Sequence, residues 1–249
     1  MKYAPIGPSA YINNVWREYG LGYHFALAQM CQASHYLLQY KTMHTYGGFI
    51  IIDNGAAEPE EERITFFEVC KHATAIRADE VVVPDILRDG PSSTKLTIDK
   101  AHLIPPNHRM IVPQGKDATD TLKSLIEIAN HVDFASIGIP KHLEKDGQRV
   151  AFLKLLISTG FLDTCHIHLL GCYKNPFKEI AEAMKVWPHI RGFDTAAPWS
   201  YAQEEVPLDF GAQEGRIPSA DFSAAVDPIH LDNNMFLMLE QVRMMNNDM

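Results

Sequence analysis

The chain has 249 residues, of which 46% are hydrophobic and 21% are charged, and this composition suits one large domain with a full core. It excludes a disordered, collagen-like or coiled-coil chain. The formal net charge of −9 argues against bulk electrostatic binding of nucleic acid, because phosphate contacts need clustered Lys and Arg, but it leaves a local basic surface open.

The apolar runs and the cysteines indicate the compartment. Runs such as Phe49–Ile52 and Val81–Val83 are far shorter than the roughly 18 residues that a membrane helix needs. Residues 1–8 lack the apolar core of a secretion signal. The four cysteines include no C-x-x-C pair, which indicates free thiols rather than a disulfide scaffold or a structural zinc. We therefore expect a cytoplasmic protein that does not engage a membrane.

Short β-branched or aromatic runs alternate with stretches of helical period, a pattern typical of parallel strands joined by crossover helices. The elements that we expect, in chain order, are the strands His24–Met30 and Gly48–Asp53, a helix over Glu60–Ile76, the strands Glu80–Asp85 and His108–Gln114, a helix over Thr119–His131, the strands Val132–Gly138 and Cys165–Gly171, a helix over Pro176–Val186 and the strand Ile190–Asp194.

These seven strand units, without a linker or low-complexity tract, suit either an α/β barrel of the (β/α)8 TIM type or a doubly wound sheet. The barrel fits the length better. We expect one barrel domain over residues 1–249. Residues 200–249 should supply the last strand or its replacement, together with a closing helix around Asn233–Met245 that packs its Met-rich face on the core.

Polar residues and glycines follow the expected strands, at the edge where both architectures gather catalytic groups. A single Asp after a strand is usually a helix cap or a turn former. Three of them, each directly after an apolar strand, predict a shared site instead. The residues at these strand ends are Asp53, Asn54 and Gly55, then Asp85, then Gln114 and Gly115, then Gly138 and Ile139, then Gly171, and finally Asp194.

The chemistry of such a set can be stated from its residue types. Two carboxylates, a Gln amide and backbone N–H groups at a glycine are complementary to a flat heterocycle with donors and acceptors, such as guanine. A further carboxylate can attack an anomeric carbon, because a nearby negative charge stabilises the oxocarbenium-like transition state. Glycosyl transfer is the predicted reaction class. Mg²⁺ binding is the alternative, although a protein usually offers Mg²⁺ only one or two carboxylates beside a phosphate.

Over roughly residues 48–200, the chain resembles the tRNA-guanine transglycosylase superfamily. Six short segments carry the resemblance in the family's order: Ile52-Asp53-Asn54-Gly55-Ala56 resembles its D-S-G-G-F, Val83-Pro84-Asp85 its base-reading Asp, Ile111-Val112-Pro113-Gln114-Gly115 its V-Q-G, Ile137-Gly138-Ile139-Pro140-Lys141 its glycine-containing base loop, His168-Leu169-Leu170-Gly171 its Y-L-M-G, and Gly192-Phe193-Asp194-Thr195 its F-D-C.

The resemblance implies a role for each matching position. Asp194 would attack C1′ of the target nucleoside and form a covalent glycosyl intermediate while guanine leaves. Asp53, with Asn54 beside it, would handle protons on the leaving and incoming bases. The guanine-like edge would be read by Asp85, Gln114 and the backbone of Gly138 and Ile139, and Gly171 would keep space for the ring or ribose. No cofactor is implied, because the incoming base, a 7-deazaguanine such as preQ0, displaces Asp194 directly.

The departures from the family decide the expected substrate. Members that act on tRNA carry a C-x-C-x-x-C zinc site with a later His, and no cysteine follows Asp194 here. Asn54 stands where Ser is usual, and Ala56-Ala57 stand where the family has glycine and an aromatic residue. The chain is thus most similar to the compact DNA-modifying branch of bacteriophages and bacterial genomic islands. We expect DNA as the partner, with tRNA second. A base in duplex DNA would have to be extruded or caught single-stranded. A homodimer is an expectation by analogy alone.

Alternatives remain at this stage. The chain could be a non-catalytic partner subunit, or another barrel enzyme such as a nucleoside hydrolase or an aldolase-type lyase. Cys165, His166, His168 and Cys172 admit a metal, with buried and satisfied strand residues as the favoured interpretation. Phe193 and Trp199 suit either stacking on a base or packing. The charges are unevenly placed: five carboxylates lie between Asp53 and Glu62, and residues 141–191 have an excess of Lys and Arg. These stretches form either solvated helix faces or an edge that faces phosphates.

Overall fold

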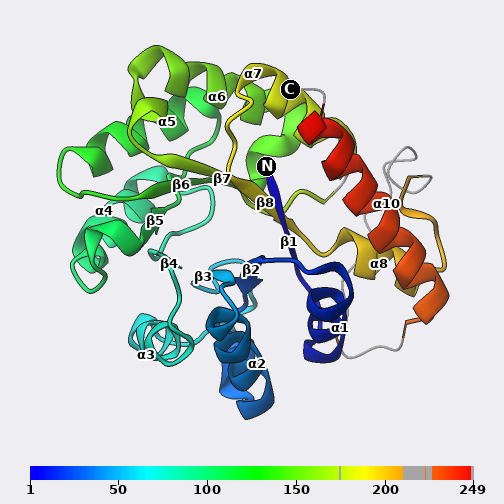
Figure 1. Ribbon diagram of the computed structural model, residues 1–249. Helices are drawn as coiled ribbons and strands as arrows, with labels where there is room; N and C mark the ends of the chain where they lie inside the picture. Colours follow the sequence, from blue (N-terminus) through cyan, green and yellow to red (C-terminus); the bar gives the residue numbers. More distant parts are fainter. Residues whose placement is uncertain (174, 210–221, 223–225, 248–249) are drawn as a thin grey trace.

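Eight short parallel strands form the centre of the molecule, and helical segments connect each strand to the next (Figure 1). The computed structural model describes residues 1–173, 175–209, 222 and 226–247. The strands are β1 (Lys2–Pro5), β2 (Tyr23–Ala26), β3 (Phe49–Ile52), β4 (Glu80–Val82), β5 (Arg109–Ile111), β6 (Ser136–Ile139), β7 (His166–Leu169) and β8 (Gly192–Thr195).

The strands pair in the order β1-β8-β7-β6-β5-β4-β3-β2, and β1 and β2 at the two ends of this order lie side by side. The sheet therefore curls into a nearly closed (β/α)8 barrel of the TIM type. This arrangement confirms the predicted fold class.

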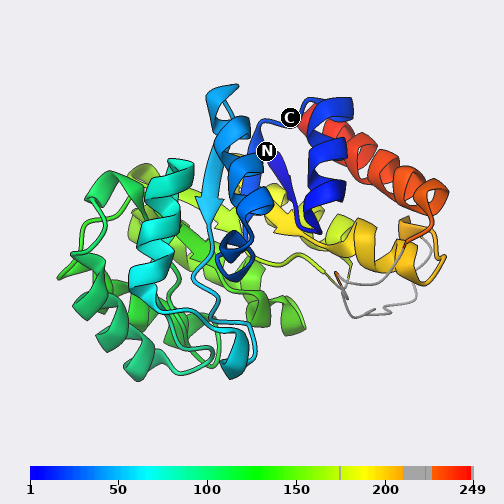
Figure 2. The same cartoon turned by 90° about the horizontal axis from the view of Figure 1, so that it is seen from below.

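Helices surround the barrel, as Figures 1 and 2 show from two directions. None of the described helices has both the length and the apolarity that crossing a membrane requires. The α-helices are α1 (Ser9–Tyr19), α2 (Ser34–Thr45), α3 (Phe66–Ile76), α4 (Gly90–Ala101), α5 (Ala118–Ala129), α6 (Gln148–Thr159), α7 (Pro176–Val186), α8 (Ala197–Gln203) and α10 (Pro228–Asn247), and the short 3₁₀ turns are η1 (Gln29–Gln32), η2 (Glu60–Glu62), η3 (Pro106–His108), η4 (Lys141–Gly147) and η5 (Phe161–Asp163).

Strand β3 illustrates why the barrel strands are continuously apolar. Successive side chains of a strand point to opposite faces. Ile51 packs inside the barrel with Phe25 and Met110, whereas Ile50 and Ile52 are buried in the layer between the sheet and the helices. Because both faces are covered, alternation of polar and apolar residues is absent from this strand.

Several helices begin with a side-chain cap placed shortly after a strand. The Asp89 carboxylate accepts a hydrogen bond from Ser92 N (3.1 Å), Asp117 accepts one from Asp120 N (2.9 Å), and Asn175 accepts one from Lys178 N (3.1 Å). Such caps satisfy N–H groups that have no partner inside the helix. They fix the point at which the chain turns away from the carboxyl edge of the barrel, and so they shape the loops of that edge.

The structure corrects the expected source of the eighth strand. Residues 200–249 do not supply a strand in their described part; the barrel is completed by β1, which pairs with β8. Residues 210–221, 223–225 and 248–249 of this segment lie outside the described residues. The expected closing helix is confirmed as α10, which is longer than predicted and begins at Pro228.

Two further boundaries were wrong for a physical reason. The helix expected over Glu60–Ile76 begins only at Phe66, because Thr65 and Glu68 form a reciprocal capping box, and the three glutamates before it form a separate turn. The strand expected over His24–Met30 ends at Ala26, where the chain turns into η1.

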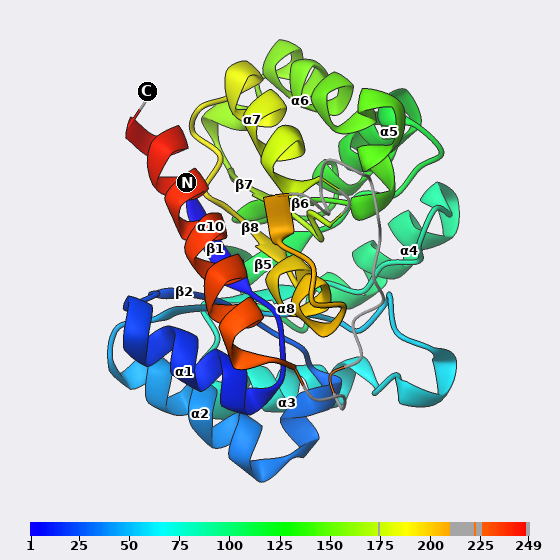
Figure 3. The same ribbon diagram turned by 90° about the vertical axis from the view of Figure 1, so that its right-hand side faces the viewer.

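The two ends of the described chain lie together, as Figure 3 shows with α10 running beside β1. The Met1 ammonium donates to Asn246 Oδ1 (2.7 Å), and Asn246 Nδ2 donates back to the Met1 carbonyl (3.1 Å). The hydroxyl of Tyr3 points to the sulfur of Met235 on α10. Helix α10 therefore holds β1 against the barrel.

Candidate active site at the carboxyl ends of the strands

A cavity of about 480 Å³ opens at the carboxyl ends of the barrel strands. This volume lies in the range of small-molecule sites. Six of the eight predicted site residues line it, namely Asp53, Asn54, Asp85, Gln114, Gly171 and Asp194. The strand-end residues therefore do meet around one hollow.

Gly138 and Ile139 are the two predicted residues that do not line this cavity. A Cβ on Gly138 would lie 2.8 Å from Leu170 Cδ1 and 3.0 Å from Val112 Cγ2, so this glycine sits beneath other lining side chains. Ile139 is fully buried on the helix-facing side of the sheet, and its carbonyl accepts a hydrogen bond from Leu170 N (3.0 Å). The neighbouring Pro140 and Lys141 line the cavity in their place.

Asp85 is held by two amide side chains. Asn54 Nδ2 donates to one carboxylate oxygen at 2.7 Å, and Gln114 Nε2 donates to the other at 2.5 Å. Burial raises the pKa of Asp85 to about 6, and these two amides act in the opposite direction. Each oxygen keeps a second lone pair, so the carboxylate can accept from a ligand while its orientation stays fixed.

Asp53 lies in the same cavity in a different environment. Burial, and then the negative charge of Asp85, raise the pKa of Asp53 to about 7, with a smaller contribution from Asp194. Gly55 N is 3.3 Å from Asp53 Oδ2. A carboxyl group that titrates near neutral pH can both give and take a proton, which is the requirement for a general acid and base.

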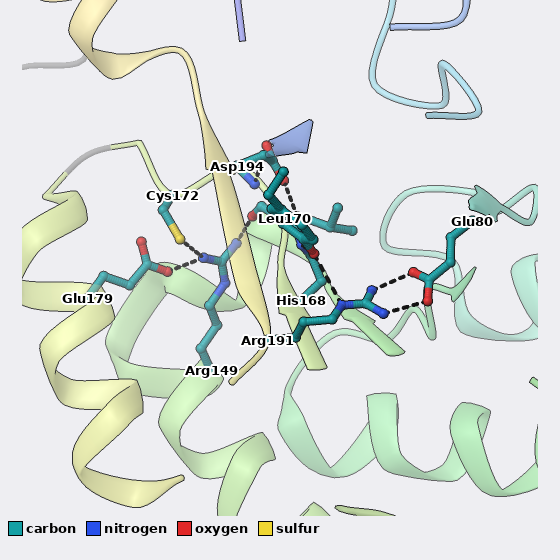
Figure 4. A network of polar contacts seen from close by, with 10 residues as sticks. Glu80, Arg149, His168, Leu170, Cys172, Glu179, Arg191 and Asp194 are labelled. Atoms are coloured by element: carbon teal, nitrogen blue, oxygen red, sulfur yellow. Dashed lines mark hydrogen bonds and ion pairs between the residues drawn. The ribbon is translucent and has the colours of Figure 1, made fainter. Parts of the chain in front are cut away.

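Asp194 is the residue before the last of β8, and N–H donors hold its carboxylate from two sides (Figure 4). His168 Nε2 donates to Oδ1 (2.9 Å), and Gly171 N donates to Oδ2 (3.0 Å). Gly171 has φ +57°, a left-handed conformation that favours glycine, and it turns its N–H toward the carboxylate. The two hydrogen bonds therefore hold the Asp194 carboxylate in one orientation.

A chain of buried polar groups continues from His168 through the barrel to its opposite end. The Tyr23 hydroxyl lies 2.8 Å from His168 Nδ1, and Arg191 Nε lies 3.3 Å from the Tyr23 oxygen. An arginine can only donate. Tyr23 therefore accepts from Arg191 and donates to His168 Nδ1, so that a neutral His168 carries its hydrogen on Nε2, the atom facing Asp194.

The far end of this chain is anchored by charge and by close packing. Arg191 forms a two-pronged ion pair with the buried Glu80, which also accepts from the Ser136 hydroxyl (2.9 Å) (Figure 4). The Tyr23 ring lies so near β8 that a Cβ on Gly192 would come within 2.4 Å of Tyr23 Cε1. Glycine at this position allows the ring to reach His168.

A second buried arginine fixes the loop that holds Gly171. Arg149 on α6 donates to the Leu170 carbonyl and pairs with Glu179 of α7, and its Nη1 lies 3.2 Å from Cys172 Sγ (Figure 4). Cys172 N in turn donates to the Asp194 carbonyl (3.0 Å). The backbone around Asp194 is therefore fastened to two helices.

The walls of the cavity are largely apolar, with three aromatic side chains among them. Phe25, Val82 and Val112 line it from the barrel interior, and Tyr173 and Phe222 line it as well. Sequence alone indicated other aromatics. Phe193 is fully buried against Tyr3 and Trp199 packs near Tyr11, so both have packing roles and neither lines the cavity.

The possible metal ligands of the β7 region do not converge. Among the residues that the structure describes, no group of three His, Cys, Asp or Glu side chains could hold a metal ion. His166 is exposed, contrary to the favoured interpretation of both histidines as buried, whereas His168 is buried between Tyr23 and Asp194. Cys172 packs against Arg149.

Sequence reasoning found the cavity-lining carboxylates but missed the chain behind Asp194. The sequence does carry a signal for this chain, namely a polar residue in an apolar strand. His168 stands between Ile167 and Leu169, which are both buried in the layer between the sheet and the helices. His168 of β7 pairs with Gly192 of β8, which stands two residues before Asp194. Because residues two apart in a strand share a face, His168 and Asp194 both point into the barrel. Tyr23 belongs to a distant part of the chain and gave no local signal.

Fold and cavity together define a (β/α)8 barrel with a carboxylate-lined pocket at the carboxyl ends of its strands. In comparisons with known proteins, the chain matches no protein-family model and none of the curated proteins.

Proposed function

We propose that the protein is a transglycosylase that exchanges guanine in DNA for a 7-deazaguanine base through a covalent intermediate on Asp194. The observation that carries the proposal is that three carboxyl groups in one cavity have three different environments. Asp194 is held by two N–H donors, Asp85 is fixed by two amides, and Asp53 titrates near neutral pH.

Base recognition is assigned to the side of the cavity that holds Asp85 and Gln114. Guanine presents N–H donors on its Watson–Crick edge, and the remaining lone pairs of the Asp85 carboxylate are acceptors for them. The apolar walls and the faces of Tyr173 and Phe222 suit a flat ring. Gly138 and Ile139 have no assigned base contact in this proposal, because neither lines the cavity.

The reaction is proposed in two displacement steps. In the first, an Asp194 oxygen forms a bond to C1′ while the bond from C1′ to the guanine nitrogen breaks, and the departing base takes a proton from Asp53. In the second, Asp53 removes a proton from the incoming 7-deazaguanine, whose nitrogen then bonds to C1′ as the Asp194 ester breaks. Two displacements at one carbon retain its configuration.

Asp194 suits the role of the attacking group for electrostatic reasons. The two N–H hydrogen bonds to its carboxylate fix the direction in which its oxygens point. The negative charge of this carboxylate stabilises the oxocarbenium-like transition state before the bond forms. The polar chain to Arg191 holds His168 in place, so that His168 acts as a positioning residue.

DNA is chosen over tRNA on the sequence resemblance to the compact branch of the superfamily, and the assignment to this superfamily remains part of the proposal. The test is to incubate the protein with guanine-containing DNA and preQ0, digest the DNA to nucleosides and analyse them by mass spectrometry. Deazaguanosine should appear with the native chain and be absent with Asp194→Asn. Equal traces in both samples would rule the proposal out.

The same experiment separates the rival functions. If the 7-deazaguanine base is incorporated when tRNA replaces DNA, but not into DNA, the tRNA-acting alternative is correct. Release of free base from nucleosides without a polymer identifies a hydrolase. A non-catalytic partner subunit would give no product alone, and Asp194→Asn would then leave base modification unchanged in the producing cell.

A further inference from the structure

One cation stands at the edge of the acidic cavity. Lys141 follows Pro140 at the end of β6 and lines the cavity, and it is exposed. Its ammonium nitrogen lies 4.3 Å from the centroid of the Tyr173 ring. A Cβ on Gly171 would come within 3.1 Å of Lys141 Cδ, so the lysine stem lies directly over this glycine. The side chain is therefore packed in a defined position.

Among the residues that the structure describes, no carboxylate pairs with Lys141. No ion pair joins it to any residue of the described chain, and the aromatic face of Tyr173 attracts the cation without cancelling its charge. A fixed, unpaired ammonium group beside a ligand cavity is suited to an anionic group of the ligand.

The position of Lys141 relative to Asp194 indicates which part of the ligand it meets. Lys141 lies over Gly171, and Gly171 N bonds to the Asp194 carboxylate. The base-reading residues Asp85 and Gln114 come from the ends of other strands, β4 and β5. The cation thus stands on the side of the cavity where Asp194 attacks the sugar. In a polynucleotide, the groups attached to that sugar are phosphates.

The rim next to Lys141 carries further exposed cations on connected loops. Arg88 and Lys116 are exposed in the loops that follow β4 and β5. Arg88 N donates to Gln114 Oε1 (2.9 Å), which joins the loop after β4 to the loop after β5. His142 Nε2 lies 2.8 Å from the Gly115 carbonyl, which joins the loop after β5 to the loop after β6. The charged residues of the loop after β3 that precede Arg63 are all acids, namely Asp53, Glu58, Glu60, Glu61 and Glu62.

We propose that Lys141 binds a backbone phosphate next to the target nucleotide, and that the nucleic acid strand leaves the cavity over the β4 to β6 side of the rim, away from the acidic loop after β3. This inference rests on the proposed function, because it takes a polynucleotide as the ligand. It explains how a chain with a net charge of −9 holds a polyanion: by placing a few cations where the phosphates pass.

The test measures binding, without base exchange. Fluorescence anisotropy of a labelled single-stranded oligodeoxynucleotide is recorded over a series of salt concentrations for the native chain, Lys141→Met and Lys145→Met. Methionine keeps the apolar stem over Gly171 and removes the charge. Lys145 is an equally exposed lysine of η4 that does not line the cavity, and it serves as the matched control.

Lys141→Met should weaken binding about 3- to 10-fold at low salt and reduce the slope of log K against log salt by about 0.7, the contribution of one phosphate contact on a single strand. Arg88→Met should reduce the slope in the same direction. Lys145→Met should change neither quantity. Binding of free guanine, followed by calorimetry, reports whether the cavity of each variant is intact.

Native affinity and native slope in Lys141→Met, with the guanine site intact, would overturn the inference, as would a native chain that does not bind the oligonucleotide. The two proposals fail separately. If the native chain exchanges guanine but Lys141→Met binds DNA normally, only the phosphate contact is wrong. If binding depends on Lys141 but no exchange occurs, only the proposed reaction is wrong.

Discussion

Asp53, Asp85 and Asp194 are the same residue type at the carboxyl ends of three strands around one cavity, and their surroundings differ. Only backbone N–H groups oppose the effect of burial on Asp53, and its pKa, raised to about 7, exceeds that of Asp85, raised to about 6. Asp85 is surrounded by amides, and Asp194 by N–H groups from His168 and Gly171. Different surroundings allow carboxyl groups of one site to take different roles in a reaction.

The first prediction concerns the pH dependence of guanine release. Its rate in a single turnover should fall as the pH rises through about 7, because Asp53 delivers the proton to the leaving base only while it is protonated, and its pKa lies near that value. The measurement is the release of radiolabelled guanine from DNA between about pH 5.5 and 8.5. Asp53→Asn should slow release by roughly 100-fold or more and remove the pH dependence. A native profile that stays flat across this range would assign the proton to another group.

The second prediction tests His168 as a positioning residue. His168→Phe should lower the rate of intermediate formation about 10- to 100-fold, because the ring keeps the packing against Phe25 but loses the N–H that faces Asp194. His168→Gln should restore most of the rate, since its amide places an N–H near the position of Nε2. Trapping of the covalent adduct in single-turnover reactions measures both variants.

A control distinguishes this role from general damage to the cavity. Binding of free guanine should stay the same in both His168 variants, because Asp85 and Gln114 do not touch this histidine. If Phe and Gln at position 168 behave alike, the hydrogen bond to Asp194 has no part in the reaction.

At the scale of elements, each of the seven strands expected from sequence overlaps a strand of the barrel, because apolar runs that are buried on both faces are strong local signals. Strand β1 escaped prediction because Lys2-Tyr3-Ala4-Pro5 contains no β-branched residue and ends in proline. Its stability comes from partners far along the chain: the ladder with β8, the stack of Tyr3 on Phe193 and the contacts with α10. Long-range contacts of this kind leave no pattern in a short window of sequence.

The candidate site likewise has features that local sequence predicts and features that depend on the folded structure. The carboxylates and the Gln114 amide were predictable, since position after a strand specifies the cavity edge of a barrel. The orientation of each side chain was not, because it depends on register and twist. Gly138 and Ile139 were expected at a strand end, but β6 runs to Ile139, so both lie within the strand and do not line the cavity. Lys141 reaches the cavity through the turn that Pro140 begins.

The third prediction concerns how α10 is joined to α8. The buried Asn234 accepts from Leu208 N (2.7 Å) and donates to the carbonyls of Val206 (3.1 Å) and Pro198 (3.4 Å). Asn234→Leu should reduce the free energy of unfolding by about 2–3 kcal/mol, since it leaves these backbone groups buried without partners. Urea denaturation measures the change. The exposed neighbour provides the control: Asn233→Leu should change stability by less than about 0.5 kcal/mol. Equal effects of the two variants would show that the Asn234 contacts are unimportant.

At the scale of the whole molecule, the barrel carries buried titratable groups that work against its stability in opposite pH ranges. His24 is buried in the helix-facing layer with neither ring nitrogen hydrogen-bonded, and burial lowers its pKa to about 4. Below its ordinary pKa of 6.5, the unfolded chain takes up a proton that the folded chain refuses, so stability falls as the pH drops from about 6.5 to 4. Asp53 has the opposite effect. Its folded pKa of about 7 exceeds the ordinary value of 3.8, so the folded chain holds a proton that the unfolded chain releases, and stability falls as the pH rises from about 4 to 7.

The last prediction follows from this sign. Asp53→Asn should raise the free energy of unfolding at pH 8 by about 2 kcal/mol, because the amide never carries the buried charge that destabilises the native chain there. At about pH 4, where Asp53 is protonated in the folded state, the two chains should differ little. Urea denaturation at both pH values measures this, and His24→Leu serves as the contrasting variant, since its gain over the native chain should appear at the acid end. A catalytic carboxyl group commonly costs the fold stability that its removal restores. If Asp53→Asn were less stable than the native chain at pH 8, the Asp53 carboxylate would be a structural group, and neither its raised pKa nor its role as proton donor would stand.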